Sequence, residues 1–480
     1  MNRKSLLQAI TATVLRSTLV ATATIAIVLS VRVYADAVDL QATEQSTQQT
    51  VTSILPAGLD PLITDIAVTD DQLLSSGVTL DTVPALLASP TMLIVDDDGV
   101  QCPNANFQTI NEAVLAAAPG ALIRVCPGVY KESVPILKAG LTLQAPQQQG
   151  QATQCKTAAA ADPTKHAILV YNTALNGGNP SIGFDVEAPG VTIEGFVVQP
   201  DPDFVGHDGV GIFTSRFYAG YDIRHNVVQN NSIGIYVNSD GSAPTYVREN
   251  CARNNNLEGA AGGTGVYSDQ GLSNAEITNN YFTGDENAAI IVDTFLTPPH
   301  DIAITHNESV NDGAIVTFAS NAGTGIPPAP PASNLQIEYN KVIGSVGSGI
   351  VTFAVTNSSY SYNHLENGTF NGISLHFTTN SVVKSNKALS FQLDGIRLGD
   401  ESDGNTVATN RAENNGAAGL RATEQSSENT IQQNHMKGNG PDCSDNTAGL
   451  HTAGTANFWV NNFGFTEDHA GICKHAQLQP

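Results

Sequence analysis

The sequence predicts an all-β protein whose chain coils into a β-solenoid of stacked parallel strands. One phrase, I-x-x-N followed by a polar turn and G-I-x-V, recurs from about residue 190 onward. Within it, runs of three to five residues alternate between apolar and polar, and this period of two is that of a strand. No helical stripe interrupts the pattern. A fixed period of a few tens of residues is typical of repeat architectures. The anchor residues of the repeat are Asn226, Asn250, Asn280, Asn307, Asn340, Asn363, Asn386, Asn410 and Asn434.

These asparagines are predicted to be structural. Stacked coils place equivalent residues about 4.8 Å apart, so an amide at a turn can donate to one neighbouring amide and accept from another. An apolar residue stands three positions before each asparagine, from Ile223 in the first repeat to Ile431 in the last. We therefore expect a buried amide ladder beside a continuous apolar core.

The chain before the repeats divides into two segments. Residues 1–35 hold four basic residues and no acid, and the uncharged apolar stretch from Thr18 to Val31 is too short to span a bilayer comfortably. This pattern predicts a signal peptide cleaved after about Ala35, with a membrane anchor as the alternative. Residues 36–90 are acidic and rich in Gln, Thr and Ser, which favours a linker or loosely packed arm. A secreted, periplasmic or cell-surface protein without stable membrane insertion is expected.

Residues 91–480 are assigned to the solenoid domain, and its first part carries a recognisable pattern. Phe107, Ile110, Val114 and Leu115 fall on one face of a helix, which would cover the open end of the first coil. With Asp96-Asp97-Asp98-Gly99 before it and Gly128-Val129-Tyr130-Lys131-Glu132 after it, the segment resembles the amino-terminal cap and first coil of right-handed parallel β-helix proteins of the pectin-lyase-like superfamily. The resemblance covers roughly residues 92–475 and implies a right-handed coil with an N-terminal capping helix.

Six cysteines in an exported chain predict disulfides. They are Cys102, Cys126, Cys155, Cys251, Cys443 and Cys473. Fifteen pairings are open in principle. Proximity in the sequence favours Cys102 with Cys126 and Cys443 with Cys473, which leaves Cys155 with Cys251.

Alternation predicts which side chains of the G-I-x-V strand point outward. The first predicted column is Phe213, Tyr236, Tyr267, Ile291, Val316, Val351, Ser374, Arg397 and Arg421, and the second is Ser215, Asn238, Asp269, Asp293, Phe318, Phe353, His376, Gly399 and Thr423. Sugar rings stack on aromatic faces, so Phe213, Tyr236, Asn238 and Tyr267 are candidate substrate-binding residues. The insertions Asn255–Gly263, Thr294–His300 and Asn321–Ser333 are expected to wall a groove at this level.

Asp269 and Asp293 admit three interpretations. They are solvated acids, or Ca²⁺ ligands together with Asn238, or a general acid/base pair. A column of aromatic residues can equally be side-chain stacking that stabilises the coil. Weaker candidates are His207-Asp208, Arg397 or Arg421 as a proton abstractor, and a metal site that uses His300 and His306.

Charge narrows the partner class. A formal net charge of −24 repels phosphate backbones, so nucleic acid is not expected as a partner. Two hypotheses remain. One is an exported protein that binds a polysaccharide or a cell-surface glycan through an exposed flank of the solenoid. The other is a polysaccharide-active lyase, hydrolase or epimerase that acts on acidic glycans. The resemblance to the superfamily implies the second without specifying a reaction.

Overall fold

The computed structural model describes residues 92–146, 155, 161–172, 181–203, 209–259, 261–293, 298–318 and 331–474. The chain separates into two units, Met1–Thr91 and Met92–Pro480, and the described residues belong to the second. The predicted signal peptide and acidic segment lie outside them, as do His207 and Asp208.

Short parallel strands form three sheets that run the length of the second unit. Sheet A contains β1 (Leu93–Val95), β2 (Leu122–Val125), β5 (Thr142–Gln144), β8 (Thr192–Glu194), β11 (Asp222–Arg224), β14 (Thr245–Arg248), β17 (Ser273–Thr278), β20 (His300–Thr305), β23 (Ala332–Glu338), β26 (Val355–Thr356), β27 (Ser359–Ser361), β30 (Val382–Lys384), β33 (Thr406–Ala408), β36 (Thr430–Gln432) and β39 (Phe458–Val460).

Sheet B contains β3 (Gly128–Lys131), β6 (Ala167–Tyr171), β9 (Val197–Pro200), β12 (Val227–Gln229), β15 (Cys251–Arg253), β18 (Tyr281–Thr283), β21 (Glu308–Val310), β24 (Lys341–Ile343), β28 (His364–Glu366), β31 (Lys387–Leu389), β34 (Arg411–Glu413) and β37 (His435–Lys437). Sheet C contains β4 (Val134–Ile136), β7 (Ser181–Val186), β10 (Gly209–Thr214), β13 (Ile233–Tyr236), β16 (Thr264–Ser268), β19 (Ala288–Val292), β22 (Ala314–Phe318), β25 (Ile350–Phe353), β29 (Ile373–His376), β32 (Ile396–Gly399), β35 (Leu420–Ala422) and β38 (Cys443–Asp445).

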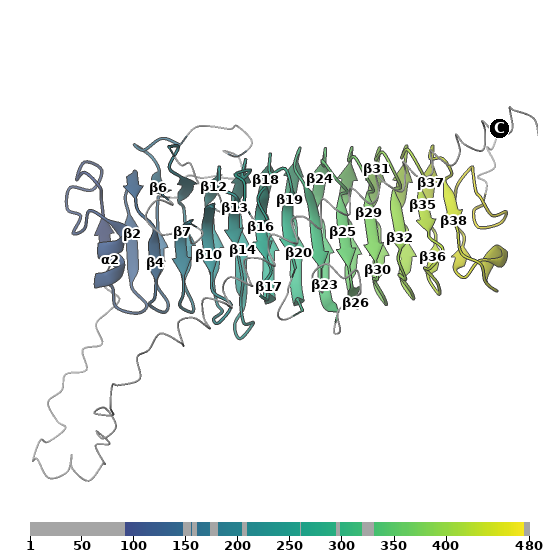
Figure 1. Cartoon of the computed structure of the whole chain (residues 1–480), viewed down its shortest axis with the longest axis horizontal. Coiled ribbons are helices and arrows are strands. Elements are labelled where there is room, and N and C mark those ends of the chain that lie inside the picture. Colours follow the sequence, from purple (N-terminus) through teal and green to yellow (C-terminus); the bar gives the residue numbers. More distant parts are fainter. Residues whose placement is uncertain are drawn as a thin grey trace, which may run out of the picture. The chain divides into compact units, whose positions relative to one another are not determined.

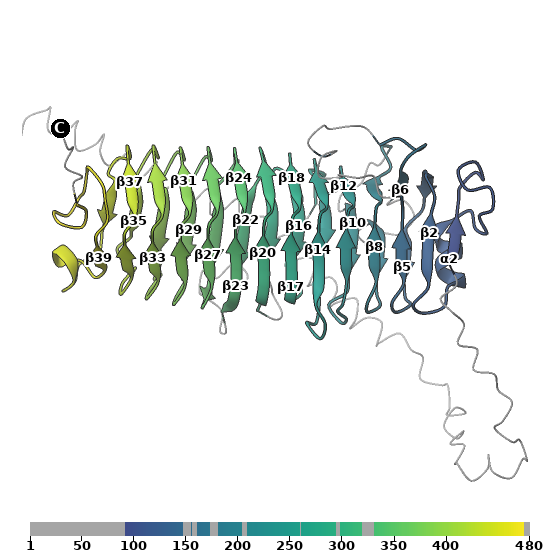
Figure 2. The same ribbon diagram turned by 180° about the vertical axis from the view of Figure 1, so that it is seen from behind.

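Successive coils stack in one row, and each regular coil gives one strand to each sheet (Figures 1 and 2). This is the predicted right-handed parallel β-helix. The repeat, however, contains a third strand that the sequence pattern did not indicate. The residues directly after each ladder asparagine, interpreted as a polar turn, form sheet B, for example Val227–Gln229 after Asn226. Three residues are too few to display a clear alternation, because only one or two of them face the core.

The predicted amide ladder is confirmed. Each asparagine side chain of the predicted column donates from Nδ2 to Oδ1 of the asparagine in the next coil, at 3.0 Å for the bonds that join Asn250, Asn280 and Asn307. Oδ1 also accepts the backbone N–H of the preceding rung, as Asn340 Oδ1 does from Asn307 N at 3.0 Å. The ladder extends past the predicted column to Asn462. Each amide is therefore saturated inside the protein, which is why a polar group can be buried there.

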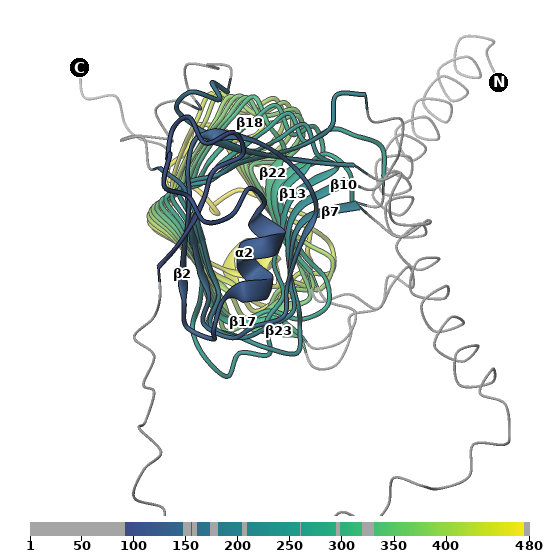
Figure 3. The ribbon, with the colours of Figure 1, turned by 90° about the vertical axis from the view of Figure 1, so that its left-hand side faces the viewer.

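The N-terminal end of the β-helix is closed by the α-helix α2 (Ile110–Ala116). In a view along the β-helix axis, α2 lies across the opening of the first coil (Figure 3). Thr109 and Glu112 form a capping box that fixes where the helix begins. Ile110, Ala113 and Val114 are buried, but Leu115 is 77% exposed. The prediction that Leu115 belongs to the buried face is wrong, because the helix is only seven residues long and rests on the coil along the Ile110–Val114 edge.

Three disulfides join the six cysteines in the predicted pairs, Cys102–Cys126, Cys155–Cys251 and Cys443–Cys473. The middle pair ties Cys155, in the long insertion after β5, to β15 across 96 residues of sequence. In the part of the chain that the structure describes, no helix has the length and apolar character needed to cross a membrane.

Candidate functional site

The predicted aromatic column lies on the outer face of sheet C. Phe213, Tyr236 and Tyr267 pair in register on β10, β13 and β16. Phe213 and Tyr236 meet edge to face with ring centroids 5.2 Å apart, and Tyr236 and Tyr267 are tilted at the same separation. Phe213 and Tyr236 are half-buried, whereas Tyr267 is only 6% exposed. Ala261, from the Asn255–Gly263 insertion, belongs to the same apolar cluster as Tyr267, so the column is not the fully exposed strip of rings that alternation predicted.

Asp269 organises the hydroxyl groups of this column. Both Tyr236 and Tyr267 donate their hydroxyls to its carboxylate, Tyr267 at 3.0 Å. The Gln270 amide in turn donates to the Tyr236 hydroxyl at 2.9 Å. Asp269 is 8% exposed, so these bonds form in a largely desolvated place. The arrangement holds two phenol groups in fixed orientations around one carboxylate.

Asp293 lies one coil further along, after β19, and is 3% exposed. Burial raises the pKa of Tyr267 well above its ordinary value, and the charges of Asp269 and Asp293 raise that pKa further. Tyr267 therefore keeps its phenol proton, which it donates to Asp269. Of the two predicted acids, Asp269 is hydrogen-bonded to this phenol. Asp293 follows in the next coil, where its backbone N–H donates to the Ser268 carbonyl at 2.8 Å.

Asn238 does not point outward as predicted. Its side chain is fully buried, and its Oδ1 accepts from Ser268 Oγ at 3.2 Å and from Gln270 N at 3.1 Å. Its Nδ2 donates to the Thr214 carbonyl at 3.3 Å. Strand β13 ends at Tyr236, so alternation no longer determines the direction of residue 238. The bond from the Gln270 backbone to Asn238 helps to hold Gln270 in place. The Asn238 amide oxygen thus already accepts from two protein donors.

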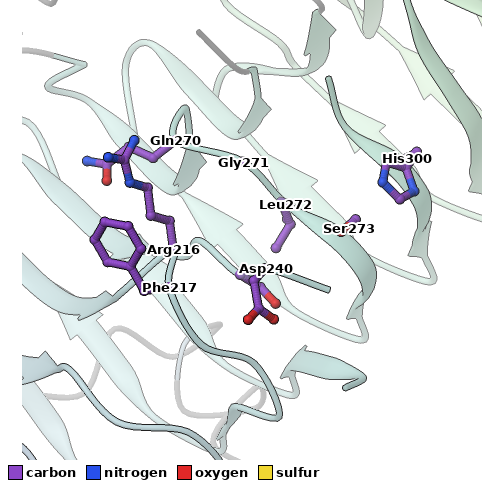
Figure 4. Close-up of a pocket in the computed structure, with 9 residues that line it drawn as sticks. Arg216, Phe217, Asp240, Gln270, Gly271, Leu272, Ser273 and His300 are labelled. Atoms are coloured by element: carbon purple, nitrogen blue, oxygen red, sulfur yellow. The ribbon is translucent and has the colours of Figure 1, made fainter. Parts of the chain in front are cut away.

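A pocket opens beside this cluster, at the turns that leave sheet C and enter sheet A (Figure 4). Its volume is about 320 Å³. The Arg216 guanidinium lies over the Phe217 ring, 4.8 Å from its centroid, and Phe217 is 66% exposed. The pocket is lined by Arg216, Phe217, Ser239, Asp240, Gln270, Gly271, Leu272, Ser273 and His300.

Gln270 connects the pocket to the phenol cluster, because it lines the former and donates to Tyr236 in the latter. Sequence reasoning missed the pocket because most of its residues come from turns, where no periodicity applies, and the other two begin strands β17 and β20. The consecutive Arg216-Phe217-Tyr218, a cation and two aromatic residues directly after a strand, is the signal that could have indicated it.

Of the weaker candidates that the structure describes, His300 lines the pocket, whereas Arg397, Arg421 and His306 do not. Arg397 and Arg421 continue the outer column of sheet C and both pair with Asp394, at 3.4 and 3.0 Å. His300 pairs with Asp301 at 2.9 Å, and this hydrogen bond lowers the pKa of Asp301. His306 stacks on Tyr339 with centroids 5.1 Å apart. Each of these groups thus has a partner that accounts for its position.

Among the described residues, only one group of three carboxylates is close enough to share a cation. It consists of Asp96, Asp97 and Asp98, at the N-terminal end of the β-helix. Backbone N–H groups of Cys102, Val129 and Val100 donate to these carboxylates at 2.6–2.8 Å. This contact network holds the first loop against β3. The predicted Ca²⁺ site at Asp269 and Asp293 stays a prediction.

The family described as "Right handed beta helix region" matches residues 300–465. The chain is a right-handed parallel β-helix protein. No curated protein matches the sequence.

Several solved structures are similar to this β-helix. The A-module of the mannuronan C-5 epimerase AlgE4 of Azotobacter vinelandii is 11% identical over 75% of this chain and 94% of that one, with a TM-score of 0.42. The catalytic unit of a GH87 α-1,3-glucanase from Streptomyces thermodiastaticus is 12% identical over 74% and 66% of the two chains, with a TM-score of 0.42. A GH87 α-1,3-glucanase domain in complex with nigerose is 13% identical over 77% and 68%, with a TM-score of 0.43. The likeness concerns the β-helix architecture.

Proposed function

We propose that this is an exported protein that binds a polysaccharide through the flank of sheet C at the Arg216–Phe217 pocket. The observation that carries the proposal is that one pocket brings together the exposed ring of Phe217, the guanidinium of Arg216 and several polar side chains. Sugar rings have apolar faces and hydroxyl edges, so an aromatic face beside oriented donors and acceptors is the surface that they fit.

Each side of the pocket suits one part of a glycan. The Phe217 ring offers the stacking surface. Gln270 and the Asp240 carboxylate reach sugar hydroxyls as donor and acceptor, and Arg216 can pair with the carboxylate of an acidic sugar. The net charge of the chain is strongly negative and would repel an anionic polymer. Such a polymer would therefore be held by the local positive charge of Arg216.

Export is part of the proposal. Three disulfides within the described residues favour an oxidising compartment, and the predicted signal peptide agrees with it. The partner would then be a polysaccharide outside the cytoplasm.

Affinity electrophoresis against a panel of neutral and acidic polysaccharides tests the binding. We expect the protein to be retarded by at least one glycan, and Phe217→Ala to weaken that binding about tenfold, which corresponds to about 1.4 kcal/mol. Phe465→Ala is the matched control, because Phe465 is also exposed (43%) but lies after β39, the last strand. The proposal fails if the wild-type protein is not retarded by any of the glycans, or if both variants weaken retardation equally.

A polysaccharide-active enzyme is the alternative. Asp269, Asp293 and the protonated Tyr267 favour it, because a carboxylate and a phenol in one desolvated place are suited to proton transfer. Incubation with the same glycans would then yield new reducing ends or unsaturated sugars, and Asp269→Asn and Asp293→Asn would abolish them. Binding without any such product favours the non-catalytic function.

A further inference from the structure

A second group of chemically active side chains lies on sheet C, several coils from the pocket. Ser374 and His376 stand two residues apart on β29, so both leave the same face of the strand. In the register of the sheet, Ser374 pairs with Arg397 and His376 pairs with Gly399 of β32. The turn after β32 brings Asp400 to the same place.

These side chains form a hydrogen-bonded chain with a defined order. Ser374 Oγ lies 2.9 Å from His376 Nε2, and His376 Nδ1 lies 2.6 Å from Asp400 Oδ2. The bond from His376 is the main cause that lowers the pKa of Asp400, so this carboxylate is ionised at neutral pH. An ionised carboxylate on Nδ1 keeps the proton on that nitrogen and leaves Nε2 free to accept from the serine.

Two donors flank the serine. Asn371 Oδ1 accepts the backbone N–H of Asp394 at 3.0 Å, which turns its Nδ2 toward Ser374 Oγ, 3.5 Å away. Arg397 lies beside Ser374 in the column. Gly399 lies beside both side chains, because a Cβ atom there would be in ordinary contact with His376 Nδ1 at 3.5 Å and with Arg397 Nε at 3.4 Å.

The other side of the serine is apolar. Val351 and Phe353 of β25 pair with Ser374 and His376 in the register of the sheet, and both are half-buried. The serine thus stands between apolar side chains in one coil and a cation in the next. Ser374 itself is 2% exposed, which restricts any reacting group at its hydroxyl to a small one.

We propose that Ser374, His376 and Asp400 are a catalytic triad that hydrolyses carboxylic esters with a short acyl group, such as an O-acetyl group on a sugar. Ser374 is the nucleophile, His376 the general base and acid, and Asp400 the positioning residue. Asn371 Nδ2 and the Arg397 guanidinium are the donors that stabilise the oxyanion. This activity goes beyond glycan binding at the pocket and does not depend on it.

The reaction balances with water as the only co-reactant. Ser374 Oγ attacks the ester carbonyl carbon and gives its proton to His376 Nε2. The bond from the carbonyl carbon to the alcohol oxygen breaks, and the same proton passes to the leaving alkoxide. Water then attacks the acyl-serine and gives a proton to Nε2, which returns it to Ser374 Oγ as the carboxylic acid leaves.

The full-length protein can be tested with p-nitrophenyl acetate and, separately, with a fluorophosphonate probe that labels activated serines. We expect hydrolysis above the buffer rate and a phosphonate adduct on the peptide that contains Ser374. Ser374→Ala should lower hydrolysis at least 100-fold and abolish the adduct. Ser444→Ala is the matched control, because Ser444 lies in the same column three coils on and donates to Asp468 at 2.6 Å. It should keep activity within twofold.

Asp400→Asn separates positioning from a merely structural role. It should lower kcat on the order of 10⁴-fold and leave KM within about twofold, with unchanged thermal unfolding. Acetate release from O-acetylated xylan would identify a glycan ester as the substrate, and release from p-nitrophenyl acetate alone would identify small free esters. A folded wild-type protein that neither hydrolyses p-nitrophenyl acetate nor is labelled at Ser374 overturns the proposal.

Discussion

Removal of one interior rung of the amide ladder should destabilise the β-helix far more than removal of an exposed asparagine. In Asn363→Ala, four hydrogen bonds of a side chain that is 1% exposed are lost. Asn363 Oδ1 accepts from Asn340 N at 2.9 Å and from Asn340 Nδ2 at 3.1 Å. Asn363 Nδ2 donates to the Ile337 carbonyl at 2.7 Å and to Asn386 Oδ1 at 3.0 Å.

The magnitude follows from these contacts. At about 1 kcal/mol of net stability per bond, the four bonds amount to about 4 kcal/mol. Two of the partners keep another contact, since Asn340 Nδ2 still donates to the Ile304 carbonyl and Asn386 Oδ1 still accepts from the residue 363 backbone N–H. The Asn340 backbone N–H loses its acceptor inside the protein. We therefore expect a loss of about 3–6 kcal/mol in the free energy of unfolding.

Guanidinium chloride unfolding followed by far-ultraviolet circular dichroism measures this loss. Asn367→Ala is the control, because Asn367 is exposed and its side chain makes a single 3.4 Å contact, with Glu366. Its backbone φ of +61° penalises alanine by about 1 kcal/mol. If Asn363→Ala costs less than 1 kcal/mol, or no more than the control, then the ladder does not stabilise the coil as we argue.

Two further perturbations test other parts of the coil. A second column of hydrogen-bonded side chains joins Asn231, Asn255 and Asp285. Asp285 is fully buried there, and burial raises its pKa to about 7. Its folded form therefore binds a proton more tightly than its unfolded form, so stability falls as pH rises from about 4 to about 7. Because its Oδ2 has no hydrogen-bond partner, Asp285→Asn should raise the free energy of unfolding by about 1–3 kcal/mol. Thermal unfolding should show a larger gain at pH 8 than at pH 4, and an equal gain at both would refute this. Separately, a Cβ atom on Gly372 would lie 2.4 Å from the Gly395 carbonyl oxygen, so Gly372→Ala should lower the melting temperature, whereas Gly440→Ala, which meets nothing within 4 Å, should change it little.

The sequence was informative wherever the repeat imposed a register. The ladder, the core positions and the order of residues along the outer column of sheet C all follow from the spacing of the asparagines. Phe213, Tyr236 and Tyr267 were correctly predicted to be neighbours because a strand of period two in a fixed coil leaves no other arrangement.

What the sequence could not specify depended on the turns and insertions. The burial of Tyr267 involves the insertion that carries Ala261, whose path no periodicity determines. Asn238 turned inward because its strand ended two residues earlier. The contact between His376 and Asp400 depends on a turn in which Asp400 has a φ of +46°, a conformation that its residue type permits but does not require.

The amide ladder has a direction. From Asn226 to Asn434, every ladder asparagine donates from Nδ2 to the amide oxygen of its carboxyl-terminal neighbour, so the amide dipoles point the same way along the axis and polarise one another. A missing rung at an end merely shortens this array, whereas one at the centre splits it into two weaker halves. Tolerance to substitution should therefore be graded along the molecule, greatest at its two extremities and least midway.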